Sequence, residues 1–394
     1  MTAPRTLARN ASLEDIVAIL RTNQARKLDV VVPASKIRSE NGVLVVSDML
    51  DLTGGGVTTV DGHYLPTAIA DAQIGEKLGI PGPYLATMRD KRPDLYDKNV
   101  NGWLHGNAGP RGDENWPLYP PDPRNFLLRL FRPGDDGELG VARSLLSDAY
   151  KPIEDLDVLM TTLEGVKEAG VTTQITAADL TDRRMYVRFI APQVNAMAMT
   201  LLRRYRSPFS GAAGIDDPIT YAGFEVSNSE VGHGAFSIAP YIMIKVCKNG
   251  MTVRDQAVRA QHLGQKLEVG QIKWSDATQA KNLDLIRAKT VDAIRAFLST
   301  EWLEKTIADI EGKSEIEVTK PEETIKVVSQ KLRYSEAQQD DILRMFIKGG
   351  DLTTGGVMQA VTASAQNQKD ADVAADMQAD ALRVLDLAVA NARF

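Results

Sequence analysis

The spacing of apolar residues predicts a helix close to the start of the chain, at 12–26. Four apolar side chains recur there at helical intervals: Leu13, Ile16, Val17 and Leu20. Ser12 can cap the first turn. Further along, the pattern predicts two short strands and a second helix, at 29–32, 42–46 and 67–78. A proline-rich segment at 106–123 ends this part, so we expect an N-terminal α/β region over 1–123.

The middle of the chain alternates apolar and polar residues, which is typical of strands. The pattern predicts strands at 124–132, 139–146, 171–175, 184–190, 219–226 and 235–246. A helix is expected at 153–169, where apolar residues share one face. Strands that follow one another through short turns pair in antiparallel fashion, so we expect a central β-rich domain at 124–275.

The last third of the chain carries helical patterns from about residue 276. One apolar stripe consists of Leu283, Ile286, Ile294, Phe297 and Leu298. Ser335, followed three residues later by Gln338, forms a capping box before a further helix. We therefore expect a helical C-terminal region at 276–394. The whole pattern predicts an α+β fold with a central, mostly antiparallel sheet and helices.

The composition is that of a soluble globular protein, with 43% hydrophobic and 25% charged residues in a chain of 394. The single cysteine, Cys247, excludes an internal disulfide, and the four histidines lack the spacing of metal ligands. The first residues lack the apolar core of a signal peptide, and the most apolar run, at 235–246, is too short to cross a membrane. We expect a cytoplasmic protein with no metal, no cofactor and no membrane partner.

Motifs of common enzymes are missing from the sequence. It has no P-loop, no dinucleotide-binding fingerprint and no nucleophile elbow. The glycine run 54–56 lacks the lysine and the helix start that a phosphate cradle needs. Cys247 falls in an apolar strand, which favours a core position over a nucleophile. We therefore expect a protein that is not an enzyme.

Acidic pairs leave one catalytic alternative open. The chain holds three of them: Asp135-Asp136, Asp216-Asp217 and Asp340-Asp341. Because two carboxylates can hold Mg²⁺ for phosphodiester cleavage, the alternative is a Mg²⁺-dependent nuclease that uses Asp216, Asp217 or Glu230. The ordinary interpretations of the three pairs are a hairpin turn, a loop, and the first turn of a capped helix, where negative charge is stabilising.

The distribution of charge is more informative than its total. The formal net charge is −6, which argues against a protein that binds nucleic acid over its whole surface. Residues 183–206, however, carry a net charge of +6, and residues 245–266 carry +4. The remainder of the chain is therefore strongly acidic, and the basic groups are concentrated in two segments of the β-rich middle.

Strand geometry places these basic groups beside aromatic ones. Because side chains alternate between the faces of a strand, Arg184, Tyr186 and Arg188 share one face, and Met185, Val187 and Phe189 share the other and enter the core. In the same way, we expect Tyr241, Met243 and Lys245 to face away from Ile238, Ile242, Ile244 and Val246. An open sheet face with basic and aromatic side chains suits single-stranded nucleic acid.

Two other interpretations of the basic segments stay open. The basic groups can form a solvated or subunit-facing surface, paired with acidic neighbours such as Glu225 and Glu230. They can also form a site for a small anionic molecule.

Several segments of the sequence resemble a family of phage- and plasmid-encoded proteins, the phage/plasmid-like protein family. The segments lie at 142–159, 224–251 and 259–264, with shorter blocks at 78–85 and 356–366. The run Ser-Asn-Ser-Glu-Val-Gly at 227–232, with the later Asn249-Gly250, is the most specific part. The resemblance implies a phage, prophage or plasmid origin, and it does not imply a catalytic motif. The order of strands and helices is also similar to that of phage single-strand annealing proteins, which form rings or filaments and hold single-stranded DNA in an outer basic groove.

We therefore expect a cytoplasmic, phage-type protein that binds single-stranded DNA and promotes annealing or recombination without ATP. Its phosphate contacts are expected to be Arg184, Arg188, Arg203, Arg204, Arg206, Lys245, Lys248, Arg254 and Arg259. Tyr186 and Tyr241 are expected to stack on bases. The expected partners are single-stranded DNA and further copies of the chain, in a ring or filament. The alternatives are the nuclease above and a non-enzymatic assembly or host-interaction protein.

Overall fold

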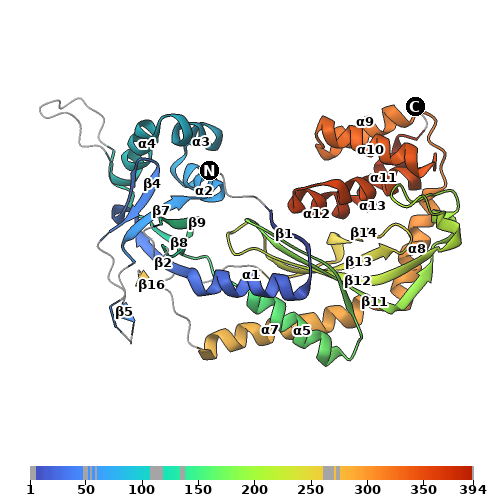
Figure 1. Cartoon of the computed structure of the whole chain (residues 1–394), viewed down its shortest axis with the longest axis horizontal. Coiled ribbons are helices and arrows are strands. Elements are labelled where there is room, and N and C mark those ends of the chain that lie inside the picture. The colour runs from blue at the N-terminus through green and yellow to red at the C-terminus, as the bar shows by residue number, and fades with distance from the viewer. Residues whose placement is uncertain are drawn as a thin grey trace, which may run out of the picture.

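The computed structural model describes residues 6–47, 52–53, 56–57, 60–106, 119–133, 138–260, 270–271 and 276–392. Its strands form two seven-stranded sheets and a small pair, β5 (Leu52–Thr53) with β6 (Gly56–Val57). The two large sheets lie toward opposite ends of an elongated molecule, and helices cover both (Figure 1). The predicted α+β fold, with largely antiparallel pairing and a helical C-terminal region, is confirmed.

The first sheet has the strand order β16-β2-β8-β9-β7-β4-β3. Its strands are β2 (Lys27–Pro33), β3 (Ile37–Glu40), β4 (Val43–Val46), β7 (Gly62–Pro66), β8 (Asn125–Phe131), β9 (Gly140–Ser147) and β16 (Gly270–Gln271). Within this described sheet, β7 and β9 pair in parallel and the other neighbours are antiparallel. Three helices pack on it: α2 (Ala68–Leu78), α3 (Gly82–Lys91) and α4 (Pro93–His105).

The second sheet is antiparallel and has the order β1-β10-β11-β12-β13-β14, with β15 paired to β13. Its strands are β1 (Thr6–Ala11), β10 (Gln174–Thr181), β11 (Met185–Met197), β12 (Ile219–Asn228), β13 (Phe236–Ile244), β14 (Asn249–Thr252) and β15 (Val258–Ala260). One face packs on α1 (Leu13–Arg26), α5 (Asp155–Ala169) and α7 (Asp276–Phe297). These helices lie below the sheet in Figure 1.

The predicted alternation along the second sheet is confirmed. Met185, Val187 and Phe189 of β11 belong to the core under the sheet, where the Phe189 and Phe224 rings stack with centroids 4.6 Å apart. Ile242 and Ile244 of β13 enter the core beside the C-terminal helices, whereas Tyr241 and Met243 belong to a separate cluster. The opposite face of the sheet therefore carries the arginines and tyrosines.

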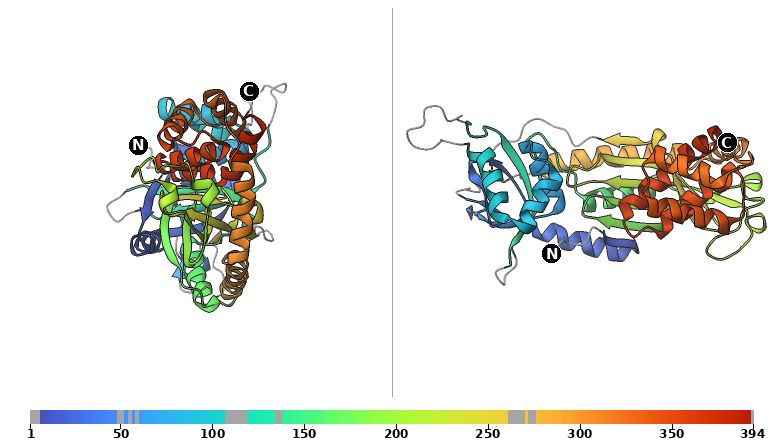
Figure 2. Two further views of the ribbon diagram at one scale, coloured as in Figure 1. Left: turned by 90° about the vertical axis from the view of Figure 1, so that its right-hand side faces the viewer. Right: turned by 90° about the horizontal axis from the view of Figure 1, so that it is seen from above.

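Five C-terminal helices stack above this second face (Figure 2). They are α9 (Pro321–Leu332), α10 (Glu336–Gly349), α11 (Thr354–Asn367), α12 (Ala371–Ala379) and α13 (Ala381–Ala390). Helix α8 (Thr300–Ser314) stands beside the end of the sheet and shares a core with Ala191 and Ala222, and the short α6 (Met199–Leu202) follows β11. The predicted capping box of Ser335 and Gln338 is present at the start of α10. Within the described ranges, no helix is long and apolar enough to span a bilayer.

The two sheets do not follow the expected division of the chain at 123 and 275. β1 pairs with β10 and so belongs to the second sheet, although it opens the expected N-terminal region. β8 and β9, from the start of the expected central domain, complete the first sheet, and β16 pairs with β2. The reason is that strand pairing is decided by contacts far apart in sequence, which a local pattern does not contain.

A buried network of charges joins the two sheets. Arg129 of β8 is fully buried, and its guanidinium contacts Asp29 of β2 at 3.0 Å and Glu154, just before α5, at 2.7 Å. Its Nη1 donates to the carbonyl of Glu230, in the loop between β12 and β13, at 2.6 Å. Lys27 adds a second cation 2.6 Å from Glu154. Arg129 therefore links a strand of the first sheet to the start of α5 and to the loop between β12 and β13 of the second sheet.

Candidate functional site

The polar face of the second sheet carries two neighbouring hollows. The first has a volume of about 690 Å³ and is bounded by β1, β10, β11, β12, β13 and helices α11 and α12. The second, of about 280 Å³, lies over β12, β13 and the segment after β14. They adjoin because Glu225 lines the second and forms an ion pair with Arg188, which lines the first. We refer to them as the first and the second hollow.

Helix α12 is fastened to this face by two polar contacts. The Tyr186 hydroxyl donates a hydrogen bond to Asp372 at 2.9 Å, and Arg254 forms an ion pair with Asp376 at 2.9 Å. Ala371, Ala374 and Ala375 are fully buried, so the helix is packed as well as hydrogen-bonded. The sheet face is therefore partly roofed, and access to it runs through the two hollows.

Arg188 forms the floor of the first hollow. It is 2% exposed, with Nε 2.8 Å from Glu225 and Nη1 2.7 Å from Asp179. Its Nη2 is buried and has no hydrogen-bond partner. Burial opposes the charge, but Glu225 and Asp179 outweigh it and raise the pKa of Arg188. The guanidinium is therefore charged, and its Nη2 amino group is left without an acceptor.

Asp179 is shared between two arginines. Arg9 of β1 approaches the same oxygen as Arg188, at 2.7 Å, and the backbone N–H of Asn10 donates to the other oxygen at 2.8 Å. Burial favours the protonated form, but the Coulombic attraction of Arg188 and Arg9 prevails and lowers the pKa of Asp179. This carboxylate fixes both guanidinium groups on one wall of the first hollow.

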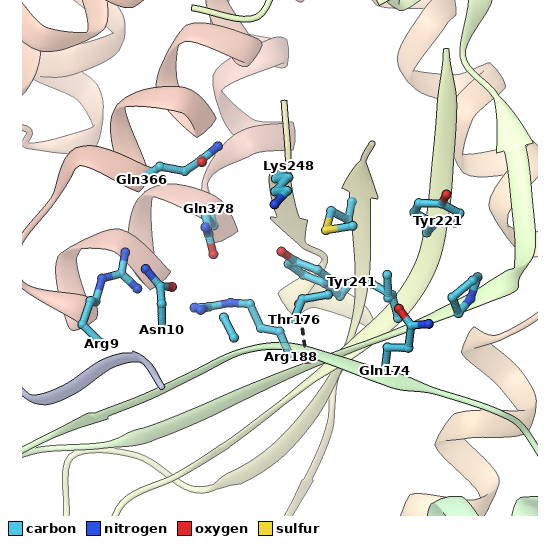
Figure 3. Close-up of a pocket in the computed structure, with 14 residues that line it drawn as sticks. Arg9, Asn10, Gln174, Thr176, Arg188, Tyr221, Tyr241, Lys248, Gln366 and Gln378 are labelled. Atoms are coloured by element: carbon cyan, nitrogen blue, oxygen red, sulfur yellow. Dashed lines mark hydrogen bonds between the residues drawn. The ribbon is translucent and has the colours of Figure 1, made fainter. Parts of the chain in front are cut away.

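Amide and phenol groups complete the first hollow (Figure 3). Gln378 of α12 is 6% exposed, and its Oε1 is buried without a hydrogen-bond partner. It points from the helix toward Arg188, while exposed Lys248 lies above Tyr241. Burial raises the pKa of Tyr241 to about 12, against the opposing charge of Arg188, so its hydroxyl keeps its proton at neutral pH. The first hollow therefore offers donors and acceptors, with cations at one wall and at the mouth.

The second hollow is smaller and more basic. Arg184, Arg254 and Arg259 line it, together with Glu225 and two serines. Arg184 donates to the carbonyl of His233, and exposed Arg259 donates to the carbonyl of Arg254 at 3.3 Å. Three guanidinium groups and one carboxylate thus line the second hollow. The carboxylate, Glu225, is paired with Arg188, and Arg254 is paired with Asp376.

Six of the predicted contact residues converge in these hollows: Arg184, Arg188, Tyr241, Lys248, Arg254 and Arg259. The expected open sheet face needs correction, because Tyr186, Arg188 and Tyr241 are 1%, 2% and 3% exposed. The cause is the roof of C-terminal helices, and Tyr186 lies beneath α12 with its hydroxyl bonded to Asp372. Neither Tyr186 nor Tyr241 presents a free ring to solvent for stacking.

The other four predicted residues lie away from the hollows. Arg203 pairs with Glu315 at 3.3 Å, and Lys245 pairs with Asp217 at 3.0 Å, both in exposed positions. Arg206 is exposed, and its Nη1 donates to the carbonyl of Gly211 at 3.5 Å. Arg204 is exposed in the same segment after α6. The alternative in which basic groups pair with acidic neighbours therefore applies to Arg203 and Lys245. It also applies to Arg188, which pairs with Glu225 on the neighbouring strand.

The carboxylates of the nuclease alternative do not meet. Asp217 precedes β12 and pairs with Lys245, whereas Glu230 follows β12 and contacts Arg143. The ten-residue strand between them spans roughly 30 Å. Among the described residues, no group of three or more His, Cys, Asp or Glu side chains could hold a metal ion. Asp135 and Asp136 lie outside the described residues.

Cys247 is a core residue, as predicted. It is 5% exposed and belongs to the cluster beneath the C-terminal helices. Burial raises the pKa of its thiol to about 11. The thiol is therefore protonated at neutral pH.

Sequence reasoning missed several residues of the first hollow, among them Arg9, Tyr221 and Gln378. Gln378 left a detectable signal, because it continues a buried stripe of small residues on α12 at helical spacing. A polar residue at the end of a buried stripe indicates a polar contact inside the protein. Arg9 left no such signal, since its partner Asp179 lies 170 residues further along the chain.

No family model, no curated protein sequence and no solved structure matches the chain. The resemblance to the phage/plasmid-like family therefore stays a prediction from its motifs. The longest of the segments that carry it, 224–251, contains all of β13 and parts of β12 and β14, on which both hollows are built.

Proposed function

We propose that this protein binds single-stranded DNA across the two hollows and promotes annealing without ATP. The observation that carries the proposal is the convergence of six of the predicted contact residues on one face of one sheet. Arg184, Arg254 and Arg259 neutralise phosphates at the second hollow, and Lys248 does so at the mouth of the first. Base pairing, rather than the protein, then selects the complementary strand.

Base stacking is assigned to a different tyrosine from the two that the sequence predicted. Tyr221 lines the first hollow and is half-buried, so part of its ring is available to a base. It replaces Tyr186 and Tyr241, whose rings are buried. The strand is thus held mainly through its backbone, with limited stacking.

The origin and the assembly are part of the same proposal. The family resemblance supports a phage, prophage or plasmid origin and a role in the host cytoplasm, and the order of elements supports rings or filaments of several copies. Electron microscopy of the purified protein with and without single-stranded DNA tests the assembly. Isolated single copies under both conditions would contradict it.

Salt dependence of strand binding tests the proposed contacts. With three to four phosphates neutralised, log K should fall against log salt with a slope of roughly −2 to −3 for a single strand. The assay is fluorescence anisotropy of a labelled oligonucleotide over a series of salt concentrations. Absence of binding at low salt would overturn the proposal.

A matched pair of variants locates the contact. Arg259→Gln removes an exposed cation from the second hollow, and Arg203→Gln removes an equally exposed cation outside both hollows. We expect Arg259→Gln to weaken binding and reduce the slope by about 0.7, which corresponds to one phosphate contact. Arg203→Gln should leave both unchanged. Equal effects of the two variants would show that binding follows total charge and not this face.

A further inference from the structure

The first hollow contains two buried polar groups of opposite hydrogen-bonding character. Arg188 Nη2 can only donate, and Gln378 Oε1 can only accept. Both side chains are more than nine-tenths buried, they line the same cavity, and neither atom has a partner. Buried polar atoms are nearly always hydrogen-bonded in folded proteins. The pair therefore marks a place where a further molecule can supply an acceptor and a donor together.

The chemistry of the pair narrows the class of that molecule. A phosphodiester or a carboxylate carries only acceptors, so it would satisfy Arg188 and leave Gln378 unmatched. A nucleobase carries ring nitrogens or carbonyl oxygens beside N–H donors on one planar edge. Such an edge matches Arg188 and Gln378 at the same time.

The remaining walls suit a planar ring with a charged group attached. Ile190, Pro192 and Met243 supply apolar contact surface, and the Tyr221 ring adds an aromatic one. Arg9 and Lys248 add positive charge to the lining (Figure 3). A volume of about 690 Å³ lies within the range of small-molecule sites.

We infer that the first hollow binds one nucleotide unit, with the edge of its base on Arg188 and Gln378 and its phosphate near Lys248. The unit is either a nucleotide of a bound strand or a free nucleotide. Binding of a nucleotide within a strand rests on the proposed function, whereas binding of a free nucleotide does not. A strand held in this way turns one base out of its stack and into the protein.

The experiment uses the full chain and four probes. Calorimetry compares deoxynucleoside monophosphates with inorganic phosphate, and anisotropy compares a labelled oligonucleotide with an abasic strand of the same length. Gln378→Leu removes the acceptor at similar volume. Gln368→Leu, just after α11 and outside the first hollow, is the control. Lys248→Asn removes the cation at the mouth while tolerating the backbone φ of 55° at this position.

We expect monophosphates to bind, inorganic phosphate not to bind, and the abasic strand to bind about tenfold more weakly than the normal one. Gln378→Leu and Lys248→Asn should weaken monophosphate binding, and Gln378→Leu should abolish the preference for bases, whereas Gln368→Leu should do neither. Monophosphate binding without strand binding would support the inference and overturn the proposed function alone. Equal binding of normal and abasic strands, with no monophosphate binding, would overturn the inference and leave the proposed function standing. Inorganic phosphate that binds as tightly as a monophosphate would also overturn it.

Discussion

Replacing Arg129 by methionine should destabilise the protein strongly, because it removes the cation at the centre of the network that joins the two sheets. Asp29 is 7% exposed and the Glu154 side chain 12%, so both carboxylates would stay buried without their guanidinium partner. Breaking a buried ion pair from one side costs about 3–5 kcal/mol. Lys27 remains 2.6 Å from Glu154 and compensates part of the loss, so we expect a value of about 3 kcal/mol.

The dependence on pH separates this explanation from simple loss of packing. Burial of Glu154 opposes its charge, but Arg129 and Lys27 outweigh burial and lower the pKa of Glu154. In the intact protein this carboxylate therefore adds stability above its ordinary pKa, and that stability is lost as the pH falls through the folded-state pKa. In Arg129→Met only Lys27 still opposes burial, so the pKa of Glu154 rises relative to the intact protein. The stability gap between the two proteins should be largest near pH 7 and should narrow toward about pH 5.

Thermal unfolding at several pH values provides the assay. A loss of about 3 kcal/mol corresponds to a fall in Tm of roughly 4 °C for a chain of 394 residues that unfolds as one unit. The triple variant Arg129→Met, Asp29→Asn, Glu154→Gln should recover most of the loss. Arg38→Met, in an exposed ion pair with Glu40, is the control and should change Tm little. A gap that stays constant with pH, or a triple variant no more stable than Arg129→Met alone, would refute the reasoning.

Three further predictions follow from buried groups. Burial and the charge of Glu230 raise the pKa of Asp155, so its contribution to stability falls as the pH rises above the ordinary carboxylate value. Asp155→Asn should therefore raise Tm at pH 8 and leave it unchanged at about pH 4, as calorimetry can measure. The Cys247 thiol, with its pKa raised to about 11 by burial, should react with a thiol reagent only after denaturant is added. Tyr186→Phe removes the hydrogen bond to Asp372 and should cost about 1–2 kcal/mol, seen as faster hydrogen exchange in α12. Unchanged exchange there would show that the buried alanines and the Arg254–Asp376 ion pair hold the helix without this hydrogen bond.

The sequence pattern was sufficient wherever a local signal decides the structure. Alternation assigned Met185, Val187 and Phe189 to the core, and the spacing of Ser335 and Gln338 located the start of α10. These features depend on residues within one strand or one turn. A local pattern reports them directly.

The pattern was insufficient where partners are distant. An arginine at an alternating strand position is compatible with solvent or with a buried ion pair, and only the neighbouring strands decide which. Asp179 and Glu225 settle this for Arg188, from β10 and β12. The roof over the sheet comes from α12, more than 180 residues after Tyr186. No local feature of the basic segments indicates that such a helix covers them.

The pairing of β1 with β10 has a consequence for how the chain folds. The two strands are joined through contacts such as Thr6 with Thr181, so the edge of the second sheet cannot close until roughly 170 further residues exist. During synthesis at about 5–20 residues per second, β1 would wait on the order of ten seconds or more beside a first sheet that itself needs β16. A fragment cut at residue 123 would separate both sheets from strands they require. Strand pairs this distant in sequence slow folding, so halves of the chain that separate them should aggregate when expressed apart.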